Sequence, residues 1–421
     1  MSSRVEGRCH PRLRKHGFWQ FPLILVLASL SVLLNLHLHE FDSSHQPEKE
    51  QANFEWTKER KLTQSGTKNP PPKETSARTC PLPDISPVHS CLRQTTSNLT
   101  LHYPADVREH VLEIHSVMQG WIQNISPHCA PRFGNGRYCG PWVENHWIEY
   151  FMNATNSSCL SDTFGSYIPL LIPWVDIWFK GGYRPRYPPL FMEKLKSILR
   201  SDVAYVTVSQ NDEGLPQEHG FPEMDNMLVM SAGGYGHVPI PLLKQREVLV
   251  EHKPMNRSWL LSDVGSLDHS PFRLRRRMHS HLEETANGSY AFYYGKEWRK
   301  TMLDSYTSLV PRGTGRTAYH LMEVLQTGLI PIHVYQDIPW VPYRRLYEQK
   351  LGYLTTVEGL PDLLKQLRNM TADDFRQREA QIESYRESHL TTEGIMHQIE
   401  AFMSTGGGDL ECGPKIKDVK N

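Results

Sequence analysis

One continuous block, SLVPRGTGRTAYHLMEVLQTGLIPIHVYQ from Ser308 to Gln336, constrains the fold more than any other part of this chain. A short apolar run stops at Pro311, and a glycine-containing turn follows, which allows a ligand to approach the backbone closely. A helix is predicted to start near Thr317 and to end at Gly328, and residues 329–334 read as a second buried strand. The block therefore predicts a β-α-β unit and a parallel sheet.

The predicted helix carries two stripes of opposite character. Arg316, His320 and Glu323 follow i, i+4 and i+7 spacing, which places a cation, an imidazole and a carboxylate on one side. The other stripe is apolar and is expected to pack on the sheet, with Ala318, Leu321, Met322 and Leu325.

The turn before this helix favours a phosphate group. The unpaired N–H groups and the positive dipole end of a helix start attract anions, and Arg312 and Arg316 add charge. Glu323, two turns further along, is suited to accept hydrogen bonds from ribose hydroxyls. Taken one by one, these residues could equally be solvated helix and loop positions. Together they predict a donor site at Arg312, Gly313, Arg316, Thr317, His320 and Glu323.

These residues resemble the signature of the exostosin family of Golgi glycosyltransferases. The resembling segments are Pro311-Arg312-Gly313, Glu323, residues 328–332 and 340–343, and the likeness extends more weakly upstream to about residue 160. The resemblance implies a GT-B fold, two Rossmann-like α/β domains facing a cleft, and transfer of a sugar with inversion from a nucleotide diphosphate, here UDP, to a glycan. The family usually has Arg where this chain has His320, so the charge there is smaller and depends on pH.

A second glycine turn follows the apolar strand predicted at residues 259–261. Gly265 precedes a helix predicted from Phe272 to Leu282 that is dense in arginine, and the resemblance implies a pyrophosphate role for Arg276, with a weaker case for Arg273. The alternative is a solvated basic helix face.

Two loops could supply the general base that inverting transfer requires. Asp212 and His237 each follow a predicted strand, and ligands of open α/β sheets bind at the carboxyl ends of strands. Asp212 is the first candidate and His237 the second. Ordinary turn chemistry explains either residue equally well.

No metal or other cofactor is expected. The sequence contains no Asp-x-Asp pair to hold a divalent cation on a diphosphate, and arginines are expected to take its place. His279 and His281 lack the i, i+4 spacing of a zinc site and are expected to be solvated.

The amino-terminal region predicts a membrane anchor. Residues 18–38 are mostly apolar and long enough to cross a bilayer, and five basic residues precede them in a cytosolic tail, residues 1–17. A cleaved signal peptide is the alternative, although no small-x-small cleavage site follows. Residues 39–79 are polar and contain three consecutive prolines, as expected of a stem. These features predict a single-pass type II membrane protein, and the resemblance to the exostosin family implies the Golgi membrane.

Sequons and cysteines agree with a luminal setting. Seven Asn-x-Ser/Thr sequons all lie beyond the membrane segment, at Asn98, Asn124, Asn153, Asn156, Asn256, Asn287 and Asn369. Six of seven cysteines lie there too, enough for three disulfides of undetermined connectivity, namely Cys80, Cys91, Cys129, Cys139, Cys159 and Cys412. Cys9 in the tail is expected to be a reduced thiol.

The remaining length predicts two domains. Strand-like runs at 204–208, 227–230, 259–261, 306–310 and 329–334 alternate with helical stretches, which is typical of α/β layers. The expected boundaries are 80–253 for an acceptor-side domain, 254–405 for a nucleotide-sugar domain and 406–421 for a tail. The net charge of zero disfavours a nucleic-acid partner, and a homo- or heterodimer is compatible with these features.

Two other functions remain compatible with this sequence. A luminal sulfotransferase also uses a strand, a phosphate loop and a helix, although its loop normally opens the catalytic domain and carries Lys where Arg312 stands. A catalytically silent subunit that stabilises an active partner is the other alternative, because of His320.

Overall fold

The computed structural model describes residues 80, 83, 89–93, 100–122, 140–152, 159–180, 187–212, 215, 224–243, 248 and 252–414. The predicted cytosolic tail, membrane segment 18–38 and stem lie outside these residues, as do Cys9, Cys129 and Cys139. Within the described ranges, no helix has both the length and the apolar character needed to cross a bilayer.

The first half of the chain builds a four-stranded sheet in the order β1-β2-β3-β4, and every pairing in it is parallel. Its central strand β2 is buried at every residue, as expected for a parallel strand covered on both faces. The strands are β1 (Ile168–Pro169), β2 (Tyr205–Ser209), β3 (Met227–Ser231) and β4 (Val238–Pro239). The helices are α2 (His89–Arg93), α3 (Val107–Ile122), α4 (Val143–Phe151), α5 (Ser161–Phe164), α6 (Trp174–Lys180) and α7 (Phe191–Ile198).

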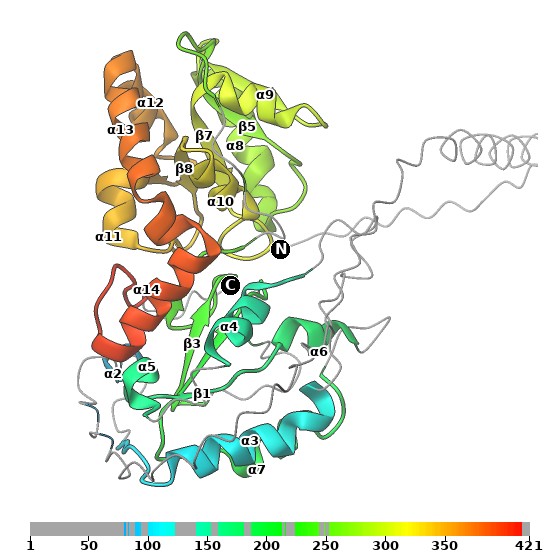
Figure 1. Cartoon of the computed structure of the whole chain (residues 1–421). Coiled ribbons are helices and arrows are strands. Elements are labelled where there is room, and N and C mark those ends of the chain that lie inside the picture. Colours follow the sequence, from blue (N-terminus) through cyan, green and yellow to red (C-terminus); the bar gives the residue numbers. More distant parts are fainter. Residues whose placement is uncertain are drawn as a thin grey trace, which may run out of the picture. The chain divides into compact units, whose positions relative to one another are not determined.

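The second half builds a five-stranded sheet in the order β6-β5-β7-β8-β9, again parallel throughout (Figure 1). Its strands are β5 (Trp259–Val264), β6 (Tyr290–Tyr293), β7 (Ser305–Pro311), β8 (Ile330–Val334) and β9 (Tyr353–Thr355). The helices between and after them are α8 (Leu274–Thr285), α9 (Trp298–Leu303), α10 (Tyr319–Gln326), α11 (Arg344–Leu346), α12 (Leu360–Arg368), α13 (Ala372–Ser384) and α14 (Thr392–Thr405). Short 3₁₀ or π turns cover Pro271–Arg273, Tyr347–Leu351 and Arg386–Leu390.

The prediction of two parallel-sheet α/β layers is confirmed, and each of the five predicted strands is present. Both predicted helix starts were two residues early: α10 begins at Tyr319 and α8 at Leu274. Phe272 and Arg273 have left-handed backbones, with φ of 55° and 54°, so the chain cannot yet be helical there. Gly328, with φ of 73°, follows the last turn of α10 as predicted.

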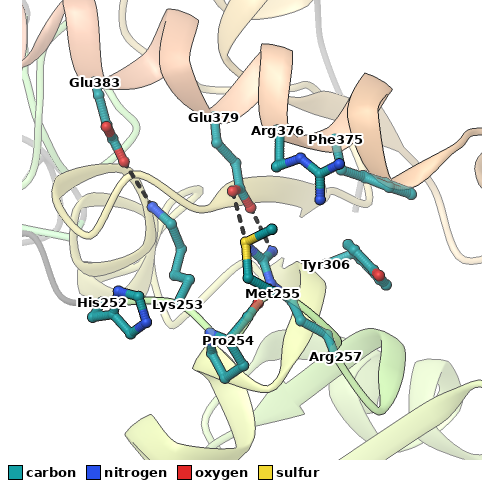
Figure 2. A pocket seen from close by; sticks show the side chains of 10 residues that line it. All are labelled: His252, Lys253, Pro254, Met255, Arg257, Tyr306, Phe375, Arg376, Glu379 and Glu383. Atoms are coloured by element: carbon teal, nitrogen blue, oxygen red, sulfur yellow. Dashed lines mark hydrogen bonds and ion pairs between the residues drawn. The ribbon is translucent and has the colours of Figure 1, made fainter.

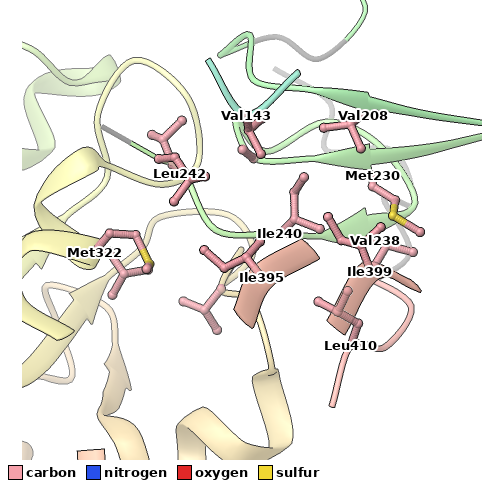
Figure 3. Packing of buried hydrophobic residues seen from close by; sticks show 14 of the residues in the cluster. Val143, Val208, Met230, Val238, Ile240, Leu242, Met322, Ile395, Ile399 and Leu410 are labelled. Carbon is pink, nitrogen blue, oxygen red and sulfur yellow. The ribbon is translucent and has the colours of Figure 1, made fainter. Parts of the chain in front are cut away.

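The last helix, α14, was assigned by sequence to the second domain, yet it packs against α4 and α5 of the first. Tyr150 of α4 donates a hydrogen bond to Glu400 at 3.0 Å. Figure 3 shows Ile399 of α14 beside Val238 of the first sheet and Ile395 beside Ile240, with Met322 of α10 in the same apolar cluster. Both sheets therefore share one continuous core, within a single compact unit.

Two disulfides reinforce this arrangement. Cys91 of α2 joins Cys412, and Cys80 joins Cys159. The first closes a separation of 321 residues and fixes the segment after α14 to the first half. The third predicted disulfide falls on Cys129 and Cys139, which lie outside the described residues.

Three of the predicted sequons can be placed. Asn256, Asn287 and Asn369 are all exposed, as an N-linked glycan requires. Asn98, Asn124, Asn153 and Asn156 lie outside the described residues. Modification of any of the seven stays a prediction.

Candidate functional site

The carboxyl ends of the two sheets meet through their loops. Asp212 follows β2, Gly233 to Tyr235 follow β3, and the predicted donor loop 312–317 follows β7. The backbone N–H of Arg316 donates to the carbonyl of Gly233 at 2.9 Å, and its guanidinium Nη1 donates to the carbonyl of Gly234 at 2.8 Å. Because ligands of open parallel sheets bind beyond the carboxyl ends of strands, this junction is the candidate site.

Glycines make this contact possible. A Cβ on Gly315 would lie 2.3 Å from the carbonyl oxygen of Gly233, and 3.1 Å from Oδ1 of Asp212. Gly234 has φ of 123°, and a Cβ there would lie 2.5 Å from the Cβ of Arg316. The two loops therefore touch backbone to backbone, at a separation that larger residues would prevent.

Asp337, just after β8, holds both arginines of the donor loop. Its Oδ1 lies 3.1 Å from Nη1 of Arg312, and its Oδ2 lies 2.8 Å from Nε of Arg316. Burial alone would raise the pKa of Asp337, but the hydrogen bond from Arg316 and the two positive charges outweigh it and hold the pKa below its ordinary value. Sequence reasoning missed Asp337, although a carboxylate three residues beyond a buried strand was a usable signal.

Arg312 and Arg316 are thus buried and already engaged. Arg312 also donates through Nε to the carbonyl of Gly315 at 3.0 Å, and the guanidinium of Arg316 lies 4.0 Å from the ring centroid of Tyr235. Their predicted contact with phosphate stays a prediction. The contacts in the structure show that these two arginines hold loop 312–317 in its conformation.

Arg316 does not share a helix face with His320 and Glu323, because α10 begins three residues after it. The predicted i, i+4, i+7 alignment is therefore wrong at its first member. His320 and Glu323 do pair, with Nδ1 and Oε2 3.1 Å apart, and His320 Nε2 lies 3.2 Å from the hydroxyl of Ser308 on β7.

Glu323 lies largely inside the protein, with 9% of its side chain exposed. The edge of the Trp298 ring system packs against His320, with centroids 5.7 Å apart. Thr317 is buried, and its carbonyl accepts a hydrogen bond from Gly313 N–H at 2.9 Å, which closes the turn. A ribose bound by Glu323 would therefore have to reach the edge of this packed cluster, and that role stays a prediction.

The second predicted glycine turn lies at Gly265. Its φ is 135°, and its N–H donates to the carbonyl of Tyr293 at 3.0 Å. Arg276, the predicted pyrophosphate contact, points to solvent and pairs with Asp268, and both side chains are more than half exposed. Its neighbour Arg275 instead joins the two glycine loops.

Arg275 donates to the carbonyl of Ser266 at 3.0 Å and to that of Arg312 at 3.2 Å. It therefore braces the loop after β5 against the loop after β7. Arg273 is exposed. Nothing in the sequence separates Arg275 from Arg273 and Arg276, because these arginines stand in one basic run.

The two candidate bases differ sharply in their surroundings. Asp212 is exposed beside Gly315, at the junction of the sheets. His237 is partly buried, its Nδ1 accepts a hydrogen bond from the N–H of Val229 at 3.0 Å, and burial lowers its pKa to about 4. Because Nδ1 accepts this hydrogen bond, the ring proton lies on Nε2, and His237 is poorly placed to accept a second proton. The geometry favours Asp212.

A buried polar network behind Asp212 was not anticipated. Glu144 accepts hydrogen bonds from the N–H groups of Val175 and Gln210 at 2.8 and 2.9 Å, and burial raises its pKa to about 8. Gln210 in turn donates to the hydroxyl of Tyr319, the first residue of α10, at 2.9 Å. These hydrogen bonds connect the end of β2 to the start of α10. A carboxylate between Val143 and Trp147, in a segment flanked by tryptophans, was the network's only sequence signal.

No group of three or more His, Cys, Asp or Glu side chains in the described part of the chain is arranged to hold a metal ion. His279 is not simply solvated as predicted: its Nδ1 lies 2.9 Å from the hydroxyl of Tyr290.

No protein-family model matches this sequence, and no curated protein matches it. Among solved structures, the chain is similar to a GtfA/B complex, with 12% identity, a TM-score of 0.26, and coverage of 46% of this chain and 43% of that one.

It is also similar to TarM, with 10% identity, a TM-score of 0.26, and coverage of 51% and 57%. A third is the pneumococcal O-GlcNAc transferase GtfA in complex with UDP and GlcNAc, with 12% identity, a TM-score of 0.27, and coverage of 47% and 44%. The chain spans about half the length of each of these structures.

Proposed function

We propose that this chain is a glycosyltransferase of the GT-B type that moves a sugar from a nucleotide diphosphate, UDP in the first instance, onto a glycan with inversion. The observation that carries the proposal is the contact between the loops at the carboxyl ends of the two sheets, where the exposed carboxylate of Asp212 lies against the glycine loop 312–317. The resemblance of that loop to the exostosin signature supports the same reading.

Asp212 would act as the general base. The acceptor hydroxyl oxygen forms a bond to the anomeric carbon, its proton passes to the Asp212 carboxylate, and the bond from that carbon to the diphosphate breaks. The leaving nucleoside diphosphate carries the negative charge away. The amino-terminal end of α10, which follows this loop, is the positive end of the helix dipole and is suited to stabilise that charge.

A pair of matched variants of the full chain tests this role. Asp212→Asn is expected to lower kcat by about 10²–10⁴-fold, the usual contribution of a general base, with little change in thermal stability. Asp225→Asn is the control, because Asp225 is also exposed but precedes β3 at the opposite edge of the same sheet. Equal activity of the two variants would contradict the assignment.

A screen of nucleotide sugars for release of free nucleotide tests the reaction itself. Release of UDP from one donor supports the proposal. Binding of an adenosine phosphosulfate in place of a uridine nucleotide would identify a sulfotransferase, and no turnover with any donor would favour a silent subunit.

We also propose that transfer needs no metal ion and takes place in the Golgi lumen, with residues 18–38 as the anchor. The absence of an Asp-x-Asp pair supports the first point, and the sequons and disulfides support the second. Activity that is lost in EDTA and restored by manganese would contradict the first. A chain from cells that carries no N-linked glycan would contradict the second.

A further inference from the structure

A pocket of about 330 Å³ opens at the amino-terminal edge of the second sheet, the edge opposite the candidate active site (Figure 2). One wall is the segment 252–257 that leads into β5, and the other is α13, which contributes Phe375, Glu379 and Glu383. These three α13 residues are four apart, so they share one helix face. The volume lies at the lower end of the range for small-molecule sites.

The floor of the pocket is aromatic. The ring of Tyr306, at the start of β7, stacks on that of Phe375 with centroids 4.7 Å apart. The guanidinium of Arg257 lies 5.1 Å from the Tyr306 centroid and completes the layer. Phe375 is buried, whereas Tyr306 stays partly exposed, so the open part of the Tyr306 ring is the surface available to the C–H face of a sugar.

The cations of the pocket already have partners. Arg257 makes a two-point contact with Glu379, with Nη2 and Oε2 2.8 Å apart, and both side chains are buried. Lys253 donates to Glu383 at 2.8 Å and to the carbonyl of Thr327 at 3.1 Å. Arg376, which also lines the pocket, pairs with Asp373 of the same helix. Because each of these three cations has a carboxylate partner, the pocket does not suit a phosphate or a metal ion. It suits a neutral ligand that has many hydroxyl groups.

The lip of the pocket carries a sequon. Met255 and Arg257 both line the pocket, and the residue between them is Asn256, which is exposed and followed by Arg257-Ser258. Met255 is itself 68% exposed, an unusual position for a large apolar side chain. A glycan on Asn256 would begin within reach of both Met255 and the aromatic floor.

We propose that this pocket binds the N-linked glycan of Asn256, whose first sugars fold back over Met255 and Tyr306. In this position the glycan covers the segment 252–257 and α13, and it forms part of the structure at this edge of the second sheet. This inference does not depend on the transfer reaction, but it rests on the luminal setting proposed above.

Accessibility of the glycan in the native full chain tests the inference. The chain is produced in eukaryotic cells and digested with an endoglycosidase under native conditions, and glycopeptide mass spectrometry follows Asn256, Asn287 and Asn369 separately. A glycan that is docked about nine-tenths of the time should be trimmed about tenfold more slowly than the two controls. Met255→Ala, at an exposed position, should bring the Asn256 rate close to theirs and leave both controls unchanged.

Equal trimming rates at the three sites would overturn the inference, as would a Met255→Ala variant that trims like wild type. An unmodified Asn256 in a chain glycosylated at Asn287 and Asn369 would overturn it while leaving the luminal setting intact. Absence of glycans at all three sites would overturn both.

Discussion

The clamp that Asp337 makes on Arg312 and Arg316 leads to a quantitative prediction for Asp337→Asn. The substitution preserves shape but leaves two buried guanidinium groups without a counter-charge, at a site where the Asp337 side chain is only 12% exposed. Removing one partner of a buried ion pair costs about 3–5 kcal/mol. With an unfolding entropy of about 2.1 cal/mol/K per residue over roughly 340 residues, Tm should fall by about 4–7 °C.

Asp268→Asn is the matched control, because it breaks an Asp–Arg pair whose two side chains are both more than half exposed. Exposed pairs contribute less than about 1 kcal/mol, so its Tm should move by about 1 °C at most. Differential scanning calorimetry of the full chain measures both variants. Equal Tm values for the two would show that the buried clamp contributes no more than a surface contact.

The pH dependence provides a second readout of the same clamp. The pKa of Asp337 is depressed in the folded state, so its contribution to stability is present above its unfolded pKa, about 3.9, and is lost as pH falls through the lower folded value. The gap between wild type and Asp337→Asn should therefore be full at pH 7 and close below about pH 4. A gap that does not narrow as pH falls below about 4 would mean that the variant acts through something other than the ion pairs.

Three further predictions concern the loops and the second sheet. Gly315→Ala places a methyl group 2.3 Å from the carbonyl oxygen of Gly233. It is expected to lower the free energy of unfolding in urea by about 1–3 kcal/mol and kcat/KM by about 100-fold. Gly120→Ala, which has open space around it, should leave kcat/KM unchanged and stability unchanged or slightly improved. Burial raises the pKa of Asp263 to about 7, so wild type should lose stability as pH rises from about 4 to 7 while Asp263→Asn does not; parallel pH profiles would refute this. Glu323→Ala should abolish UDP binding in calorimetry with the fold retained, and unchanged affinity would exclude a ribose contact.

Local patterns predicted the elements around the candidate site well. The apolar run, the glycine turn and the 3.6-residue stripe between residues 308 and 334 correspond to β7, α10 and β8, because each of these signals acts within one element. Four strands were not predicted, namely β1, β4, β6 and β9. They are two to four residues long, so their own residues carry too little period, and their pairing with other strands defines them.

Partner choice could not be predicted in the same way. The chain spacing of Arg312 and Arg316 indicates a cationic turn, but the carboxylate that holds them comes from the end of another strand, at Asp337. Likewise, no local pattern indicates that Gln210 reaches the hydroxyl of Tyr319, or that the loops 233–235 and 312–317 touch.

The sequence by itself therefore determined the parallel α/β character of both halves, the β-α-β unit after Ser305 and the disulfide-forming chemistry of the cysteines, since these depend on residue type and period. Only the tertiary structure decided that α14 packs against α4 and α5, that Asp337 pairs with both arginines of loop 312–317, and that Asn256 lies at the lip of a pocket. The physical reason is range: periodicity and turn chemistry act over a few residues, whereas ion pairing and burial depend on which distant segments pack together.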